Sequence, residues 1–272
     1  MEGTILLVGC GKMGGALLEG WFKRGLLPVD AMVVEPAGRD AVSPCKTHRA
    51  LGCVASVRDV PRDFHPDVIL FAVKPQIADS VVPEYKTLVA QQPVILSVIA
   101  GKTTGYFRER LGTDAVVRAM PNTPAAIGRA ISVLYAAPAV SAVQRRVCEV
   151  LMSAVGQVEW LADETQMDAV TAVSGSGPAY VFLLAEAMRD AGIKAGLPAD
   201  LATRLARATI AGSGALMEAQ AATPPEQLRK NVTSPGGTTA AALEILMGAG
   251  GVPALMEQAV AQATKRSKEL AG

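Results

Sequence analysis

The chain has 272 residues, which is enough for two modest domains, each with a core of its own. Half of the residues are apolar but only 4% are aromatic, which is typical of helices that pack through small side chains. Lysine and arginine (26) almost balance aspartate and glutamate (25), so nothing indicates a nucleic-acid or anionic-lipid partner. No apolar run of about 18 residues occurs, and residues 1–8 lack the features of a secretory signal. We therefore expect a cytoplasmic protein without a membrane partner, whose ligand is a small molecule.

Cysteine and histidine are too sparse to form a metal site. The chain has four cysteines and two histidines, namely Cys10, Cys45, Cys53, Cys148, His48 and His65. They show neither a CxxC pair nor zinc-ligand spacing, so we expect no metal and no disulfide framework. Both histidines fall in polar connecting stretches, where surface positions are expected. Any chemistry in the C-terminal half must therefore proceed without histidine.

The N-terminal half alternates between strand and helix patterns. A short aliphatic run, Thr4–Val8, is followed by three glycines and then by the helical pattern Ala16–Trp21. Further strand runs follow, separated by stretches long enough for crossovers: Ala31–Val34, Val68–Val73, Val94–Ile99 and Ala115–Arg118. This alternation predicts an α/β fold with a doubly wound parallel sheet over residues 1–161.

Strand runs stop beyond about Glu159, and residues 162–272 are expected to form an all-helical domain. The predicted helices are Gln166–Val173, Ala179–Ala191, Pro198–Gln220, Pro225–Val232, Thr239–Met247 and Pro253–Leu270. Several begin at a proline, which is tolerated in a first helical turn. Gly212 and Gly214 lie inside the longest helix, where each costs roughly 1 kcal/mol against alanine. Close helix packing would account for them, in a dimer or in a crossing within the chain.

The glycines after the first strand carry the clearest binding signal. Gly9-Cys10-Gly11-Lys12-Met13-Gly14 fits GxGxxG between a strand and a helix. Such glycines permit a tight turn and the close approach of backbone to a pyrophosphate at the helix N-terminus. This position predicts a dinucleotide site, although the pattern alone is also that of a plain glycine-rich turn.

The end of the second predicted strand bears on the choice of nicotinamide cofactor. Glu35 lies 21 positions beyond Gly14, where an acidic residue accepts hydrogen bonds from the adenosine ribose and repels a 2′-phosphate. This favours NADH. Arg39, with Ser43 and Lys46 further along, could instead turn a loop toward a 2′-phosphate, so both NADPH and NADH stay open.

Three later strands end in segments that should meet at the same edge of the sheet, because the strands are predicted to be parallel. Ligands of open α/β folds bind at this edge, where the carboxyl ends of the strands lie. The three segments are Phe71-Ala72-Val73-Lys74-Pro75-Gln76, Ser97-Val98-Ile99-Ala100-Gly101 and Arg118-Ala119-Met120-Pro121-Asn122-Thr123-Pro124. Individually each is an ordinary strand exit. Together they predict one crevice.

Two polar, glycine-containing segments interrupt the helical half. Thr171–Tyr180 gathers hydroxyls around helix-breaking glycines, and Ser234-Pro235-Gly236-Gly237-Thr238-Thr239 leads directly into a helix. A glycine loop before a helix offers free backbone amides to a carboxylate or phosphate. A helix connector with a Ser/Thr cap is the alternative interpretation.

These segments together resemble the pyrroline-5-carboxylate reductase family over almost the full length, most specifically in the Ser174–Tyr180 and Ser234–Thr239 stretches. The resemblance implies a Rossmann domain at 1–161 and a helical substrate-binding and dimerisation domain at 162–272. It also implies NADPH- or NADH-dependent reduction of 1-pyrroline-5-carboxylate to L-proline, the last step of proline biosynthesis, by a homodimer or a ring of homodimers.

The resemblance also implies residue roles. The cofactor set expected from motif and resemblance is Gly9, Gly11, Lys12, Met13, Gly14, Glu35, Arg39, Ala72, Val73, Lys74, Pro75, Ala100, Gly101 and Asn122. The substrate set is Ser176, Gly236, Gly237, Thr238 and Thr239. Thr239 would hydrogen-bond the ring nitrogen, and Thr171 would act beside it as the second catalytic residue.

Two rival functions differ from this one in testable ways. A β-hydroxyacid dehydrogenase requires a catalytic lysine on the first helix after the domain junction, whereas Thr171–Arg189 has no lysine and Lys194 is expected to lie past that helix. A non-catalytic NAD(P)-binding regulatory protein would bind ligand without turnover.

Overall fold

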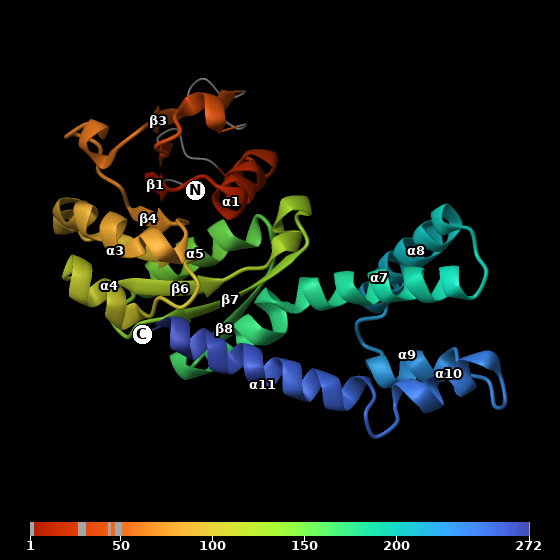
Figure 1. Cartoon of the computed structure of the whole chain (residues 1–272). Helices are drawn as coiled ribbons and strands as arrows, with labels where there is room; N and C mark the ends of the chain where they lie inside the picture. Colours follow the sequence, from red (N-terminus) through yellow and green to blue (C-terminus); the bar gives the residue numbers. More distant parts are fainter. Residues whose placement is uncertain (1–2, 27–30, 43–44, 47–50, 272) are drawn as a thin grey trace. The chain divides into compact units, whose positions relative to one another are not determined.

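Figure 1 shows the computed structural model, which describes residues 3–26, 31–42, 45–46 and 51–271. The chain forms two compact units. The first comprises Met1–Gly175 together with Ala263–Gly272, and the second comprises Ser176–Gln262. The last helix, α11 (Val252–Ala271), begins in the second unit and ends in the first.

The first unit is built on an eight-stranded sheet in the order β3-β2-β1-β4-β5-β6-β7-β8. The strands are β1 (Ile5–Val8), β2 (Ala31–Val34), β3 (Gly52–Val54), β4 (Val68–Phe71), β5 (Val94–Ser97), β6 (Val116–Met120), β7 (Ala130–Ala136) and β8 (Gly156–Leu161). All pairs are parallel except β6 with β7. The five strands expected from sequence are present, and the predicted doubly wound α/β fold is confirmed. The antiparallel pair departs from a wholly parallel sheet.

Both faces of this sheet are covered, and successive side chains of each strand alternate between the two faces. In β1, Ile5 and Leu7 join one buried cluster with Trp21 of α1 (Lys12–Lys23) and Leu151 of α5 (Ala142–Ser153). Leu6 joins the opposite cluster. That cluster also contains Tyr85 from the 3-10 segment η4 (Val82–Gln91) and Phe107 from α4 (Thr104–Leu111). The Trp21 indole N–H donates to the buried Leu151 carbonyl at 2.9 Å, fixing α1 against α5.

The helical half follows the predicted pattern closely. Its helices are α6 (Met167–Val170), α7 (Gly177–Lys194), α8 (Ala199–Ala219), α9 (Pro225–Asn231), α10 (Thr238–Leu246) and α11. The prediction that Gly175 and Gly177 break the helix is wrong. Residues Thr171–Gly175 instead form a π-helical turn that leads into α7. Lys194 is the last residue of α7, not a residue beyond it.

The expected boundary at 161/162 coincides with the end of β8 but not with the limits of the compact units. Helix α6 and the π-helical turn remain part of the first unit, and the Ser267 hydroxyl of α11 donates to Asp168 of α6 at 2.7 Å. The compact units therefore divide at 175/176 and again at 262/263, and the boundary at 161/162 stays a sequence-based prediction.

Gly212 and Gly214 of α8 face open space. A Cβ built at either residue would meet no described atom within 4 Å. Within the described part of the chain, no crossing helix therefore packs against these two glycines.

We expect Gly156→Ala to destabilise the first unit by about 3 kcal/mol or more. Gly156 has φ 152°, and its Cβ would lie 1.9 Å from the Ala130 carbonyl oxygen of β7. Gly112→Ala is the matched control, since Gly112 has φ 77° but open space around it and should lose only about 1 kcal/mol. Urea denaturation measures both. Equal losses of unfolding free energy in the two variants would show that backbone strain, rather than the close approach of β7 and β8, excludes a side chain at residue 156.

Candidate functional site

The turn after β1 brings helix α1 unusually close to the strand ends. Gly9 has φ 85°, and its N–H donates to the Val34 carbonyl of β2 at 2.9 Å. A Cβ on Gly9 would lie 2.8 Å from Val73, and one on Gly14 would lie 2.3 Å from the Gly9 carbonyl oxygen. The Gly9 Cβ would also lie 3.1 Å from the Ala72 carbonyl. Because backbone atoms cannot move away as the end of a flexible side chain can, only glycine permits this approach.

Gly11 leaves room in front of the α1 N-terminus. Gly11 is the N-cap of the 12-residue helix α1, and no side chain caps the helix there. A Cβ at Gly11 would meet no described atom within 4 Å. Uncapped first-turn amides and the helix dipole favour an anion at this place. The turn therefore fits a pyrophosphate.

Gly11 also lines a cavity of about 570 Å³ at the carboxyl ends of the strands, which we call the strand-end pocket. Its lining residues are Val8, Gly9, Gly11, Val34, Glu35, Pro36, Ala55, Ser56, Val57, Ala72, Val73, Lys74, Ile77, Val81, Glu84 and Tyr85. Its size is within the usual range of ligand pockets, about 300–1,000 Å³. Val8 of β1 is in register with Val34 of β2 and with Phe71 of β4, so these three strands end side by side at the pocket.

Glu35 is fixed at this pocket by two backbone N–H groups. The Cys10 N–H donates to Glu35 Oε2 at 2.8 Å, and the Ala37 N–H donates to Oε1 at 3.2 Å. The Glu35 carbonyl accepts the Gly38 N–H at 2.8 Å, which closes a tight turn directly after β2. The side chain is thus held against the glycine turn.

The thiol within the glycine turn adds no charge to it. Burial, together with the nearby Glu35 carboxylate, raises the pKa of Cys10 to about 12. The thiol is therefore protonated at neutral pH and does not repel an anion bound at the α1 N-terminus.

Arg39 lies outside the lining of the strand-end pocket. Its guanidinium donates to the Cys45 carbonyl at 2.7 Å and to the Leu51 carbonyl. Lys46 is exposed, and Ser43 lies outside the described residues. Of the two histidines, His65 is exposed and His48 falls among the residues that are not described.

The structure brings together six of the expected cofactor residues in the pocket lining: Gly9, Gly11, Glu35, Ala72, Val73 and Lys74. The remaining members of that set do not line it: Lys12, Met13, Gly14, Arg39, Pro75, Ala100, Gly101 and Asn122. Sequence reasoning missed Ser56 and Val57, which follow the unpredicted strand β3, and Glu84 and Tyr85 from η4. The signal that could have found the first two was the short apolar run Cys53-Val54, one strand beyond Glu35.

The loop after β6 is fastened to the π-helical turn. Asn122 Nδ2 donates to the Ser174 hydroxyl at 3.3 Å, and Asn122 Oδ1 accepts the Ile131 N–H at 3.2 Å. A Cβ on Gly175 would come within 2.5 Å of the Met120 methyl carbon. The Thr171 hydroxyl donates to the Met167 carbonyl at 2.9 Å. π-Helical turns are frequent at functional sites, and this one lies beside the strand-exit loop that sequence singled out.

The second unit contains another uncapped helix N-terminus. Gly236 has φ 70°, and the Gly237 N–H donates to the Ser234 carbonyl at 3.1 Å. A Cβ on Gly237 would lie 2.5 Å from the Ser234 hydroxyl oxygen. Helix α10 then starts at Thr238 with Gly237 as its N-cap and no side-chain cap. Its first-turn amides therefore suit a carboxylate.

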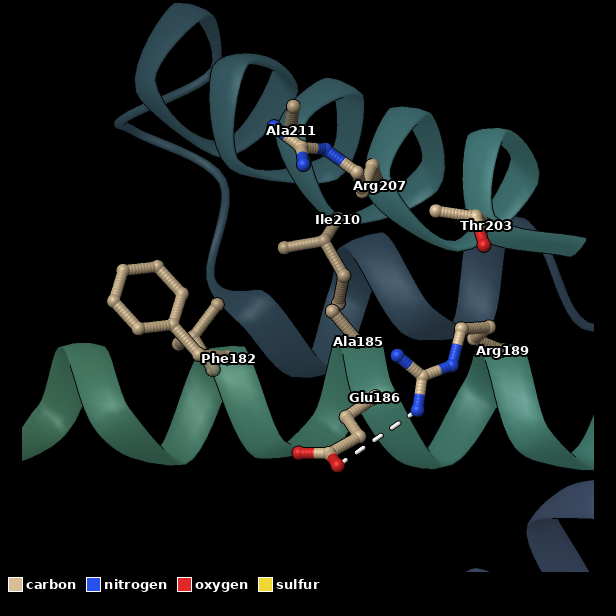
Figure 2. Close-up of a pocket in the computed structure, with 9 residues that line it drawn as sticks. Phe182, Ala185, Glu186, Arg189, Thr203, Arg207, Ile210 and Ala211 are labelled. Carbon is tan, nitrogen blue, oxygen red and sulfur yellow. Dashed lines mark ion pairs between the residues drawn. The ribbon is translucent and has the colours of Figure 1, made fainter. Parts of the chain in front are cut away.

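A groove of about 660 Å³ lies between α7 and α8 in the second unit (Figure 2). The groove is lined by Val181, Phe182, Ala185, Glu186 and Arg189 of α7 and by Thr203, Arg207, Ile210 and Ala211 of α8. Glu186 and Arg189 form an ion pair at 3.7 Å. Sequence reasoning assigned no role to this groove.

Large apolar side chains of the second unit are widely exposed, as in Phe182 (67%), Leu183 (63%) and Ile245 (78%). Monomeric proteins rarely expose apolar surface on this scale, which usually marks a protein interface.

Comparison with known proteins identifies the family. Residues 164–270 match the model described as pyrroline-5-carboxylate reductase dimerisation, and residues 4–101 match the NADP oxidoreductase, coenzyme F420-dependent model. Pyrroline-5-carboxylate reductases of Pseudomonas aeruginosa and Pisum sativum are 41% and 38% identical to the chain, in each case over 98% of the chain and 96% of the relative. The chain belongs to the pyrroline-5-carboxylate reductase family. This confirms the resemblance, the enzyme class and the nicotinamide cofactor expected from sequence.

Solved structures agree with this assignment. A pyrroline-5-carboxylate reductase from Coxiella burnetii has a TM-score of 0.90 at 32% identity, covering 100% of both chains. The Plasmodium falciparum enzyme, solved with NADP bound, has a TM-score of 0.84 at 29% identity over 99% of this chain and 98% of its own.

The described residues include neither a membrane-spanning helix nor a candidate metal site. None of their helices combines the length and apolar character that a membrane span requires. Nor do three or more of their His, Cys, Asp or Glu side chains gather as metal ligands would.

We expect Gly11→Ala to weaken NADH and NADPH binding at least about tenfold while changing the free energy of unfolding by less than about 0.5 kcal/mol. The added methyl would enter the strand-end pocket without touching the protein. Gly14→Ala should lose both stability and binding, because its Cβ would strike the Gly9 carbonyl. Nicotinamide fluorescence titration and urea denaturation measure the two effects. Unchanged cofactor affinity in Gly11→Ala would contradict the assignment of the pyrophosphate site.

Proposed function

We propose that the chain reduces 1-pyrroline-5-carboxylate to L-proline with NADPH or NADH, the last step of proline biosynthesis. The observation that carries this proposal is the full-length match to enzymes named for that reaction, at up to 41% identity. The N-termini of α1 and α10, each with a glycine N-cap and no side-chain cap, support it, because the reaction needs one place for a pyrophosphate and another for a carboxylate. A cytoplasmic location stays a sequence-based prediction.

In this proposal the cofactor lies along the strand-end pocket. Amides of Gly11, Lys12, Met13 and Gly14 bind its pyrophosphate at the α1 N-terminus, and Glu35 lies at its adenosine ribose. The segments after β4, β5 and β6 hold the rest, through Ala72, Val73, Lys74, Pro75, Ala100, Gly101 and Asn122. Arg39 would join them only by releasing the carbonyls of Cys45 and Leu51.

The substrate carboxylate binds the α10 N-terminus through Gly236, Gly237, Thr238 and Thr239 in this proposal. The Thr239 hydroxyl meets the ring nitrogen, with Thr171 and Ser176 beside the ring. Since the Thr171 hydroxyl proton is directed at the Met167 carbonyl, its oxygen offers lone pairs to the N–H of the ring.

A reduced nicotinamide held by the glycine turn and by the segments after β4, β5 and β6 would supply a hydride to C5 of the ring imine. A pyrroline imine is basic and arrives protonated, so its nitrogen keeps that proton and becomes the amine of proline. No histidine is needed. The residues act by positioning, which is worth up to roughly 7–11 kcal/mol when the geometry is good.

The direct test follows nicotinamide absorbance with pyrroline-5-carboxylate as substrate and each cofactor in turn. We expect rapid oxidation that depends on both substrates. A folded sample that binds nucleotide but oxidises neither cofactor would contradict the proposed function and favour the regulatory alternative.

We expect Thr239→Ala to lower kcat about 10- to 100-fold, the size of one hydrogen bond to a charged group, with the Kd for NADPH unchanged within about twofold. Thr233→Ala is the control, because the Thr233 hydroxyl donates to the Arg229 carbonyl and lies outside the loop. Steady-state kinetics and fluorescence titration separate the effects. An equal loss of turnover and NADPH affinity would remove Thr239 from the substrate site.

We also propose that the second unit forms a homodimer with a second copy of the chain. The apolar side chains exposed on α7, α8 and α10 and the open glycines Gly212 and Gly214 then become buried. A ring of such dimers is the larger assembly that the family resemblance implies.

Phe182→Glu should convert the dimer to a monomer or raise its dissociation constant at least about 100-fold, because it places a charge on the exposed apolar surface that the dimer would bury. Val143→Glu is the control, since Val143 of α5 is 74% exposed but belongs to the first unit. Analytical ultracentrifugation gives the mass of each. A monomeric parent protein, or a dimer that tolerates Phe182→Glu, would contradict this interface.

A further inference from the structure

The acceptor capacity of Glu35 suits a ribose with two free hydroxyls. A carboxylate offers about four acceptor positions. The N–H groups of Cys10 and Ala37 occupy one position on each oxygen, so about two positions remain. An adenosine ribose presents neighbouring 2′- and 3′-hydroxyls, each a donor, and that pair matches the remaining positions.

Resting on the proposed function, we infer that Glu35 makes this chain selective for NADH by accepting the 2′-hydroxyl and excluding the 2′-phosphate of NADPH.

Electrostatics explains the exclusion. A 2′-phosphate carries about −1.5 to −2 charge at pH 7 and has no hydroxyl proton to donate in place of the one it replaces. Glu35 does not swing aside freely, because its two oxygens are held by backbone N–H groups from two different segments, one after β1 and one after β2. A phosphate at that place would meet a fixed carboxylate.

The described surroundings offer a 2′-phosphate little compensation. Lys74 is the single basic residue in the pocket lining, and it follows β4 rather than β2. Arg39, the nearest basic residue in sequence, has its guanidinium directed at the Cys45 and Leu51 carbonyls. The related Plasmodium falciparum structure contains NADP. The fold itself therefore admits a 2′-phosphate, and the selectivity inferred here comes from residues of this chain.

Binding of two nicotinamide-free probes to the full-length protein tests the inference without turnover. The probes are ADP-ribose and 2′-phospho-ADP-ribose, titrated by calorimetry. We expect the Kd for ADP-ribose to be at least about tenfold lower than that for the phosphorylated probe. Glu35→Gln should reduce this ratio at least about tenfold, because it keeps the size of the side chain and removes its charge. Raising the salt concentration should lower the ratio of the two Kd values in the parent protein, because salt screens the repulsion between Glu35 and the 2′-phosphate.

Glu84→Gln is the matched control, since Glu84 is the other acidic residue of the same pocket lining. It should leave the ratio within about twofold of the parent value. A parent protein that binds both probes equally, or the phosphorylated probe more tightly, would overturn the inference and leave the dinucleotide site standing. An equal change of the ratio in Glu84→Gln would likewise overturn the role of Glu35. Failure of a folded parent protein to bind either probe would instead contradict the proposed function.

Discussion

The contact between Gly14 and the Gly9 carbonyl determines where the rest of the cofactor half lies. With the Gly14 Cα this close to the turn, α1 begins at the ends of the strands, and its N-cap residue Gly11 lines the strand-end pocket. The same turn is also hydrogen-bonded to the end of β2, because the Gly9 N–H donates to the Val34 carbonyl and the Cys10 N–H donates to the Glu35 carboxylate. One glycine contact therefore sets both the anion-binding amides and the carboxylate beside them, and a side chain at either glycine would disturb both at once.

The residues of this turn were predictable because their roles depend on order along the chain. A strand, three spaced glycines, a helix and an acidic residue one strand later are local features, and the parallel register brings them together wherever the fold is doubly wound. The antiparallel β7 was not predictable in this way, since the direction of Ala130–Ala136 is set by pairing with β6. The three-residue β3 has too little pattern to be recognised alone. Because β3 was not predicted, Ser56 and Val57 were not predicted as pocket residues either. They reach the pocket only because β3 pairs with β2.

Arg39 shows the limit of position as a guide to function. It stands four residues after Glu35, where a cation could reach a ribose phosphate, yet the structure turns its guanidinium to the Cys45 and Leu51 carbonyls. Those partners lie 6 and 12 residues away, and nothing in the sequence distinguishes them as acceptors. The role of Gly175 in the π-helical turn Thr171–Gly175 likewise could not be deduced from its position in the sequence. This glycine could be read as a helix breaker, whereas in the structure the missing side chain admits the Met120 methyl group.

The two nicotinamide cofactors share their pyrophosphate, so the glycine turn cannot distinguish them. Backbone amides recognise charge and shape at that group, and every dinucleotide presents the same group there. Discrimination must come from a side chain at the one position where the cofactors differ, the ribose 2′-oxygen. In the strand-end pocket the side chain placed one strand beyond the glycine turn is a carboxylate, and the turn itself holds it through the Cys10 N–H. The selectivity of this site therefore depends on a single charge that the binding motif has fixed in position.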